Sequence, residues 1–171
     1  MKGVHYLASV VRVYRAAIDR YCANPANYQP DPAWLTELDT ISNRGYTTGF
    51  LFGNPRDVGQ TYHAGYHRTH QLVAVIEEII TPGLALVMVK NRFSEGESFS
   101  LIGPGMRNAS FTATALRQRT ALGEEDHRQT VHPNMLVVME VPVESAAGDL
   151  IRREEDTPPS ATEPCHTGCS C

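Results

Sequence analysis

The hydrophobic pattern changes its period near residue 69, and this change limits the chain to folds that join helices to short strands. Before it, apolar residues recur every three or four positions, which is the spacing of one helix face. After it, short apolar runs alternate with turns that contain glycine or proline. A chain of 171 residues can hold one domain with a sizeable core and a helical arm. The pattern therefore predicts an α+β fold.

The first predicted helix covers residues 4–22. Asn24-Pro25 ends it, because the residue before a proline disfavours helical backbone. Polar residues such as His5 and Arg12 fall mostly on one face of this helix, and apolar residues share the other. The apolar face consists of Leu7, Val10, Val11, Tyr14, Ala17, Ile18 and Tyr21.

A second helix is predicted from Pro32 to about Asn43. Asp31 is a natural N-cap, proline suits the first helical position, and Gly45 can take the left-handed backbone that often follows a helix end. The apolar face of this helix consists of Trp34, Leu35, Leu38 and Ile41.

The strand-rich part predicts a small closed antiparallel β-barrel. About six short strands with glycine turns between them are typical of such barrels. They are expected at 71–80, 85–90, 98–102, 110–115, 135–141 and 149–151. Residues 114–120 could instead form a short helix.

These patterns divide the chain into four parts. We expect a helical arm with a motif loop over residues 1–53, a linker over 54–68 and the barrel over 69–153. An acidic, disordered tail that contains cysteines is expected over 154–171, since it is rich in proline and threonine.

Charge and composition exclude several classes of protein. Residues 1–139 carry 13 Lys and Arg against 12 Asp and Glu, so any RNA contact must be a local patch rather than a basic surface. No apolar stretch is long enough to span a membrane, and charges interrupt any signal-peptide core. Three of the four cysteines lie in the last seven residues, unlike a disulfide framework. We therefore expect a cytoplasmic protein.

The motif loop, residues 42–53, contains the candidate contact residues. Its sequence mixes one cation with aromatic rings, adjacent hydroxyls and three glycines. One interpretation is a loop that contacts phosphate or substrate through Arg44 and backbone N–H groups. The other is a helix end followed by an interdomain plug with Phe50 and Phe52 buried. The candidate residues are Arg44, Tyr46, Thr47, Thr48, Gly49 and Phe50.

The tail offers possible metal ligands at Cys165, His166, Cys169 and Cys171. Thiolates and imidazole suit zinc or an iron–sulfur cluster. The spacing matches no familiar zinc finger, however, and a flexible tail that binds metal adventitiously or oxidises easily is the alternative. No cofactor is expected in the rest of the chain, and no catalytic triad or phosphate-binding glycine loop has a signature there.

Several segments in order resemble the C-terminal region of the collagenase-like peptidase family, whose catalytic type is unassigned and which includes tRNA and rRNA hydroxylation proteins. The resemblance implies that a larger catalytic domain precedes this region in full-length members. It also implies a barrel similar to the second domain of translation factors such as elongation factor Tu. Asn43 stands where many members have histidine. The segments are 2–19, 31–38, 42–53, 65–68, 91–97, 101–105, 132–133 and 148–153.

Three functions follow from these observations. The first is an accessory module that docks RNA or another substrate, or braces the catalytic domain or subunit of the family, and is not catalytic alone. The second is part of a true collagenase-like peptidase. The third is a metal-binding protein that uses its tail. We also expect the first helix to self-associate or bind a partner through Leu7, Val11, Tyr14 and Ile18, because its apolar stripe adjoins the missing domain in the relatives.

Overall fold

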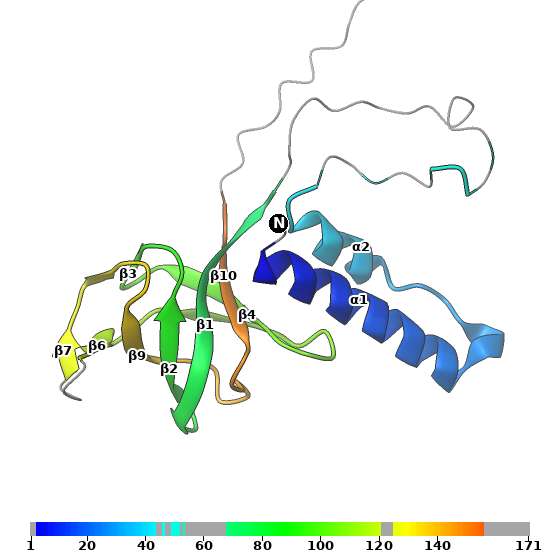
Figure 1. Cartoon of the computed structure of the whole chain (residues 1–171). Coiled ribbons are helices and arrows are strands. Elements are labelled where there is room, and N and C mark those ends of the chain that lie inside the picture. Colours follow the sequence, from blue (N-terminus) through cyan, green and yellow to red (C-terminus); the bar gives the residue numbers. More distant parts are fainter. Residues whose placement is uncertain are drawn as a thin grey trace, which may run out of the picture.

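Two helices lie beside a twisted antiparallel sheet in the computed structural model of this chain (Figure 1). The structure describes residues 3–43, 46, 49–51, 53, 68–120 and 125–155. The observed architecture is α+β, as the change of period predicts.

The helical part contains α1 (Val4–Ala23), a short 3₁₀ turn (Pro25–Asn27) and α2 (Pro32–Asp39). The Asp31 carboxylate accepts a hydrogen bond from the backbone N–H of Ala33 at 3.0 Å, which confirms the predicted N-cap. The second helix is shorter than predicted. It ends at Asp39 because the Thr40 hydroxyl and backbone N–H both bond to the carbonyl of Glu37 and tighten the last turn.

The sheet has eight strands in the order β5-β4-β10-β1-β2-β9-β6-β7, and all of its pairings are antiparallel. A separate ribbon pairs β3 (Phe93–Ser94) with β8 (Thr130–Val131). The strands of the large sheet are β1 (His70–Thr81), β2 (Leu84–Val89), β4 (Ser98–Ile102), β5 (Asn108–Thr112), β6 (Arg117–Arg119), β7 (Glu125–His127), β9 (Leu136–Glu140) and β10 (Leu150–Glu154).

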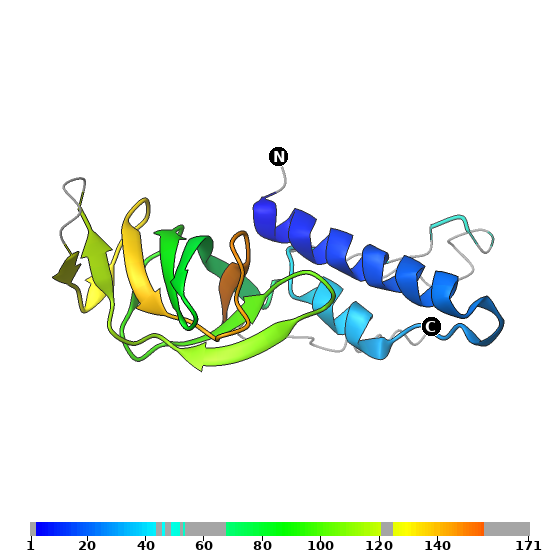
Figure 2. The same ribbon diagram turned by 90° about the horizontal axis from the view of Figure 1, so that it is seen from below.

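The prediction of a closed barrel is wrong, because the sheet is open. Its edge strands, β5 and β7, do not pair with each other in the part of the chain that the structure describes. The β4–β5 hairpin instead reaches toward the helices (Figure 2), and Arg12 of α1 donates hydrogen bonds to the Arg107 carbonyl and the Asn108 side chain beside it. The turn end of the β4–β5 hairpin thus contacts the helical arm.

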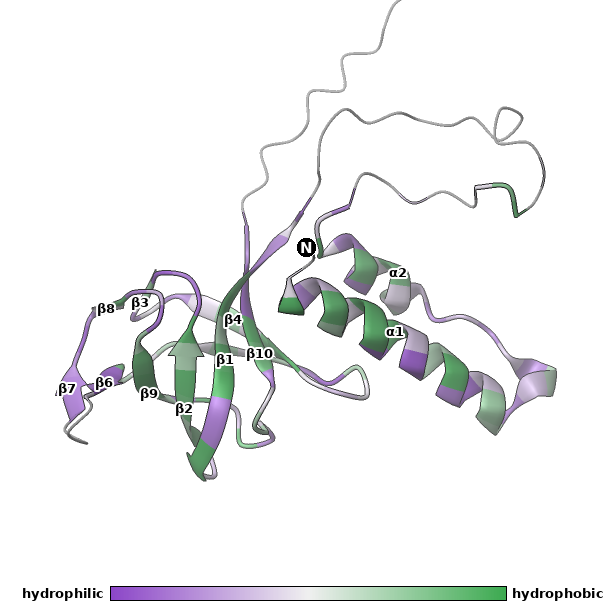
Figure 3. Cartoon of the chain, in the orientation of Figure 1, coloured by the Kyte–Doolittle hydropathy of each residue, from purple (hydrophilic) through white to green (hydrophobic). Residues whose placement is uncertain are grey.

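The core lies on the sheet. Figure 3 shows long hydrophobic stretches along the central strands, where buried residues alternate or run together because both faces of β2 and β9 are covered. Phe93 of the small ribbon packs edge-on to Phe99 with ring centroids 5.1 Å apart, so the ribbon closes one side of the core.

Four short strands, β3, β6, β7 and β8, have no counterpart among the predicted strands. β6, β7 and β8 are two or three residues long and carry mostly polar residues, so they lack the apolar run that marks a strand. The alternative helix over 114–120 is also wrong. Arg117–Arg119 is strand β6, which pairs with both β7 and β9.

The end of α2 is joined to the start of the sheet by a backbone hydrogen bond. The N–H of His70 donates to the carbonyl of Thr40 at 3.2 Å. The residue that follows α2 and the first residue of β1 therefore lie side by side. No helix among the described residues is both long and apolar enough to cross a membrane.

Candidate functional site

A buried ionic cluster fixes the helices to the sheet. The carboxylate of Glu37 on α2 receives two hydrogen bonds from Arg152 on β10, at 2.9 and 3.0 Å, and one from the Ser9 hydroxyl on α1 at 2.9 Å. Arg12 approaches the same carboxylate at 3.6 Å. The side chains of Arg12, Glu37 and Arg152 are at most 5% exposed. The cluster therefore joins three elements that are far apart in the sequence.

Two guanidinium groups thus share one carboxylate away from water. Burial raises the pKa of Glu37, but the hydrogen bond and charge of Arg152 and the charge of Arg12 outweigh it, so the pKa lies below its usual value. Burial lowers the pKa of Arg12, and Glu37 partly offsets this effect. The Nε atom of Arg12 is buried and has no hydrogen-bond partner. Removing the carboxylate would leave two buried cations without compensation.

Two histidines lie close to the cluster. Burial, followed by the charge of Arg152, lowers the pKa of His5 from 6.5 to about 4. Burial and Arg152 also lower the pKa of His70, at the start of β1. The Nε2 atom of His5 is buried without a hydrogen-bond partner, so the structure favours the neutral imidazole.

The opposite side of α1 is apolar and exposed, and we call it the outer stripe. Its six residues are between 51% and 63% exposed. Figure 3 shows hydrophobic positions recurring along this helix. The polar side of α1 faces the protein and its apolar side faces solvent, the reverse of the usual amphipathic helix. The outer stripe consists of Val4, Leu7, Val11, Tyr14, Ile18 and Tyr21.

A groove of about 280 Å³ continues from the outer stripe to the β4–β5 turn. Its floor includes Gly103, and beside it Arg107 forms an ion pair with Asp149 at 2.5 Å. The Asp149 side chain is 1% exposed, and its carboxylate also accepts a hydrogen bond from the backbone N–H of Ala146. The groove is lined mostly by apolar side chains, among them Ala8, Val11, Ile102, Pro104 and Leu150.

We expect Gly103→Ala to destabilise the protein by about 1–3 kcal/mol, because the added methyl group would overpack this position. A methyl group there would collide with the Arg107 guanidinium and would lie 2.6 Å from Asp149 Oδ1. The change can be measured by urea unfolding. Gly3→Ala is the comparison, since a methyl group there meets no atom within 4 Å and only the smaller loss of the glycine N-cap of α1 is expected. Equal stability of the two variants would contradict this prediction.

The structure describes part of the motif loop. The Tyr46 hydroxyl donates to the Leu38 carbonyl at 2.7 Å, which brings the loop back against α2. Burial raises the pKa of Tyr46, with Asp39 and Tyr6 adding to the shift. Phe50 is 83% exposed, so it is not buried against this chain. Gly49 has a φ of +55°, in the left-handed region that favours glycine.

The other predicted site residues lie outside the described residues. These are Arg44, Thr47 and Thr48 of the motif loop, Phe52 of the plug interpretation, and the possible ligands Cys165, His166, Cys169 and Cys171. Within the described residues, no group of three or more His, Cys, Asp or Glu side chains could hold a metal ion. A metal site in the tail therefore stays a prediction.

Sequence reasoning missed the ionic cluster. Polar residues on one face of α1 suggest a solvent-facing side, so nothing in that pattern indicates burial. A signal exists on α2, where Glu37 lies at helical spacing between Trp34 and Ile41, which are both buried. A carboxylate on an apolar face is expected to have a buried cationic partner.

The structure thus defines a pair of helices joined to an open antiparallel sheet by buried ion pairs. The apolar face of α1 is exposed. Residues 1–61 match the family model described as Peptidase family U32, and residues 68–152 match the Peptidase family U32 C-terminal domain. The chain belongs to peptidase family U32, which confirms the resemblance seen in the sequence.

Relatives in this family are much longer than this chain. It is 35% identical over 116 residues to tRNA hydroxylation protein P1 of Bacillus subtilis, covering 66% of this chain and 27% of that protein. It is 37% identical over 113 residues to tRNA hydroxylation protein P of Escherichia coli, covering 65% and 24%. The chain spans about a quarter of the length of these relatives.

A solved structure with a partly similar fold comes from the same family. It is the C-terminal domain of a Geobacillus thermoleovorans protein described as a U32 peptidase, in its selenomethionine variant. The match has 19% sequence identity and a TM-score of 0.41, and it covers 48% of this chain and 99% of that domain.

Proposed function

We propose that this chain is the C-terminal accessory part of a family U32 protein that takes part in RNA hydroxylation. It docks RNA or braces the catalytic part, and it has no catalytic activity alone. The observation that carries this proposal is the outer stripe, an exposed apolar face on a helix whose polar side is locked to the sheet by the ionic cluster. Large exposed apolar surfaces mark sites of interaction. The names of the Bacillus and Escherichia relatives support RNA as the substrate class.

The proposal can be tested in a Bacillus strain that lacks tRNA hydroxylation protein P1. One strain receives this chain alone, a second receives the intact Bacillus protein, and a third receives a chimera in which this chain replaces the matching region of that protein. We expect hydroxylated nucleosides in tRNA from the second and third strains only, measured by mass spectrometry. Hydroxylation in the strain with this chain alone would contradict the accessory role.

Proteolysis is a second candidate function, because the family is described as a peptidase family. It predicts that the intact Bacillus protein and the chimera cleave collagen-like peptides. Cleavage by both, with no effect of either on tRNA, would favour the peptidase function over RNA hydroxylation.

If the motif loop contacts RNA, Tyr46→Ala is expected to weaken binding by about 1–3 kcal/mol, the usual contribution of a base stacked on an aromatic ring. Tyr46→Phe is the matched control. It keeps the ring, loses the hydrogen bond to Leu38, and should lower stability by about 1 kcal/mol with little change in RNA affinity. Both quantities can be measured on the same samples, by RNA titration and by thermal unfolding.

Arg44→Ala extends the same test to the cation of the motif loop. We expect weaker RNA binding, and a salt dependence of the binding constant reduced by about one phosphate contact. If the loop serves as an interdomain contact instead, Arg44→Ala and Tyr46→Ala lower stability or partner affinity and leave RNA binding unchanged.

A further inference from the structure

The spacing of the outer stripe is regular along the whole of α1. Val4, Leu7, Val11, Tyr14, Ile18 and Tyr21 are separated by alternating steps of three and four residues. These are the a and d positions of a heptad, which lie in one row on a helix. A continuous row of exposed large apolar side chains over five helical turns is the pattern of a face that packs against other protein.

The inner face of α1 already has its partners. His5, Ser9, Arg12 and Val13 are buried, and Ser9 and Arg12 take part in the ionic cluster. The helix therefore cannot turn its apolar side inward without breaking that cluster. Within the described part of this chain, the outer stripe therefore stays exposed.

The composition beside the stripe distinguishes two possible partners. A second copy of α1 would form a coiled coil, which normally carries complementary charges at the flanking positions. Here those positions hold Ala8, Val10 and Ala17, which are half-buried and apolar, the exposed Cys22, and Arg15, which pairs with Asp19 on its own helix at 2.8 Å. The apolar surface is thus broader than a two-helix seam and resembles that of a helix facing a domain core.

The division between the two family models points to the same partner. Both helices fall in residues 1–61, matched by the Peptidase family U32 model, whereas the sheet falls in residues 68–152, matched by the C-terminal domain model. Since relatives are about four times longer than the matched part, most of their polypeptide has no counterpart here. The helices are thus matched by a different family model from the sheet, and in the relatives this region adjoins a much longer stretch of polypeptide.

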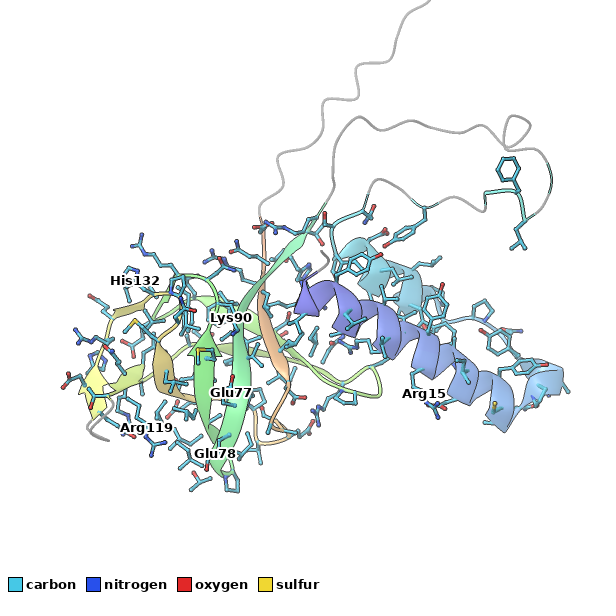
Figure 4. All side chains as sticks on the ribbon, viewed as in Figure 1. Arg15, Glu77, Glu78, Lys90, Arg119 and His132 are labelled. Atoms are coloured by element: carbon cyan, nitrogen blue, oxygen red, sulfur yellow. The ribbon has the colours of Figure 1, made fainter. Side chains whose placement is uncertain are left out.

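We propose that the outer stripe is the surface on which the remaining part of a family U32 protein packs, so that α1 is a core helix of that larger unit. This proposal rests on the proposed function and names its protein partner. The groove beside the β4–β5 turn extends the same interface, because Val11 and Arg15 line both the groove and the exposed side of the helix. Figure 4 shows Arg15 on the side of α1 that faces this hairpin. An apolar side chain of the partner would fill the groove.

The test compares the accessibility of one residue in two settings. Val11→Cys is made in this chain and in the chimera with the Bacillus protein, and both are exposed to a thiol reagent, with labelling located by peptide mass spectrometry. We expect rapid labelling in the chain alone and labelling slower by about tenfold or more in the chimera, as for a site that reacts only on local opening. Arg119→Cys on β6, which is exposed and distant from α1, is the control and should label equally in both.

Equal labelling of Val11→Cys in the two settings would overturn the proposal. Protection in the chain alone, together with a dimer in analytical ultracentrifugation, would also overturn it and identify a second copy as the partner. If the chimera does not fold, the cysteine is placed in the intact Bacillus protein at the residue aligned with Val11, where the same protection is expected and free labelling would overturn the proposal. The labelling measures the accessibility of the outer stripe, whereas the proposed function is tested by hydroxylation of tRNA. Failure of the interface proposal and failure of the proposed function therefore give different results.

Discussion

Replacing Glu37 with alanine is expected to lower the free energy of unfolding by about 3–5 kcal/mol, the usual cost of removing one partner from a buried ion pair. Arg152 would lose two hydrogen bonds at 2.9 and 3.0 Å, and Arg12 would lose the carboxylate nearest to it. The change can be measured by urea unfolding followed through the fluorescence of Trp34, the single tryptophan, which is buried on the same helix.

Asp19→Ala is the matched control for this experiment. Asp19 also pairs with an arginine, at 2.8 Å, but both side chains are more than half exposed. An exposed pair four residues apart on a helix contributes about 0.3–0.5 kcal/mol. If Glu37→Ala costs no more than Asp19→Ala, the helices are not held to the sheet by the ionic cluster.

Acid should destabilise the protein in a window set by His5. The pKa of His5 is lowered from 6.5 to about 4, so the unfolded chain binds a proton at a higher pH than the folded chain does. The stabilisation is therefore complete above pH 6.5 and is lost as the pH falls through about 4. We expect a loss on the order of 3 kcal/mol across this window. The pKa of His70 is shifted in the same direction and adds to the effect.

Urea unfolding at a series of pH values measures this loss. His5→Gln removes the titrating group and should flatten much of the slope between pH 6.5 and 4. His132→Gln, which removes an exposed histidine on the turn before β9, should keep the slope. Despite burial, the pKa of Glu37 is lowered, mainly by Arg152, so its stabilisation is present above the ordinary glutamate pKa and is lost as the pH falls below it, at the acid end of the histidine window. A slope that survives in His5→Gln would show that other groups govern acid unfolding.

Local patterns were enough to predict the helices and the long strands. Asp31 and Pro32 mark the start of α2 because capping depends on neighbouring backbone groups, and β2 and β9 follow from apolar runs between turns. The outer stripe was also visible as a row of apolar residues. In each case the pattern lies within one helix or strand, where residues at a fixed spacing in the sequence lie on the same face.

Features that depend on distant contacts could not be predicted in the same way. The sheet closes only if β5 pairs with β7, and the sequence of neither strand indicates which strand lies next to it. Arg152 and Glu37 are 115 residues apart, so their pairing has no local signal. The buried polar face of α1 was missed for the same reason, since helical periodicity gives two faces but does not say which one the protein covers.

The hydrogen bond between His70 and Thr40 has a consequence for the diversity of related chains. It joins the residue after α2 to the first residue of β1, so the two ends of the segment between these elements are held together. The entropy of closing a loop grows only with the logarithm of its length, and doubling it costs about 0.6 kcal/mol. Insertions and deletions between these joined ends are therefore expected to cost little folding free energy, so related chains can differ in the length of this segment.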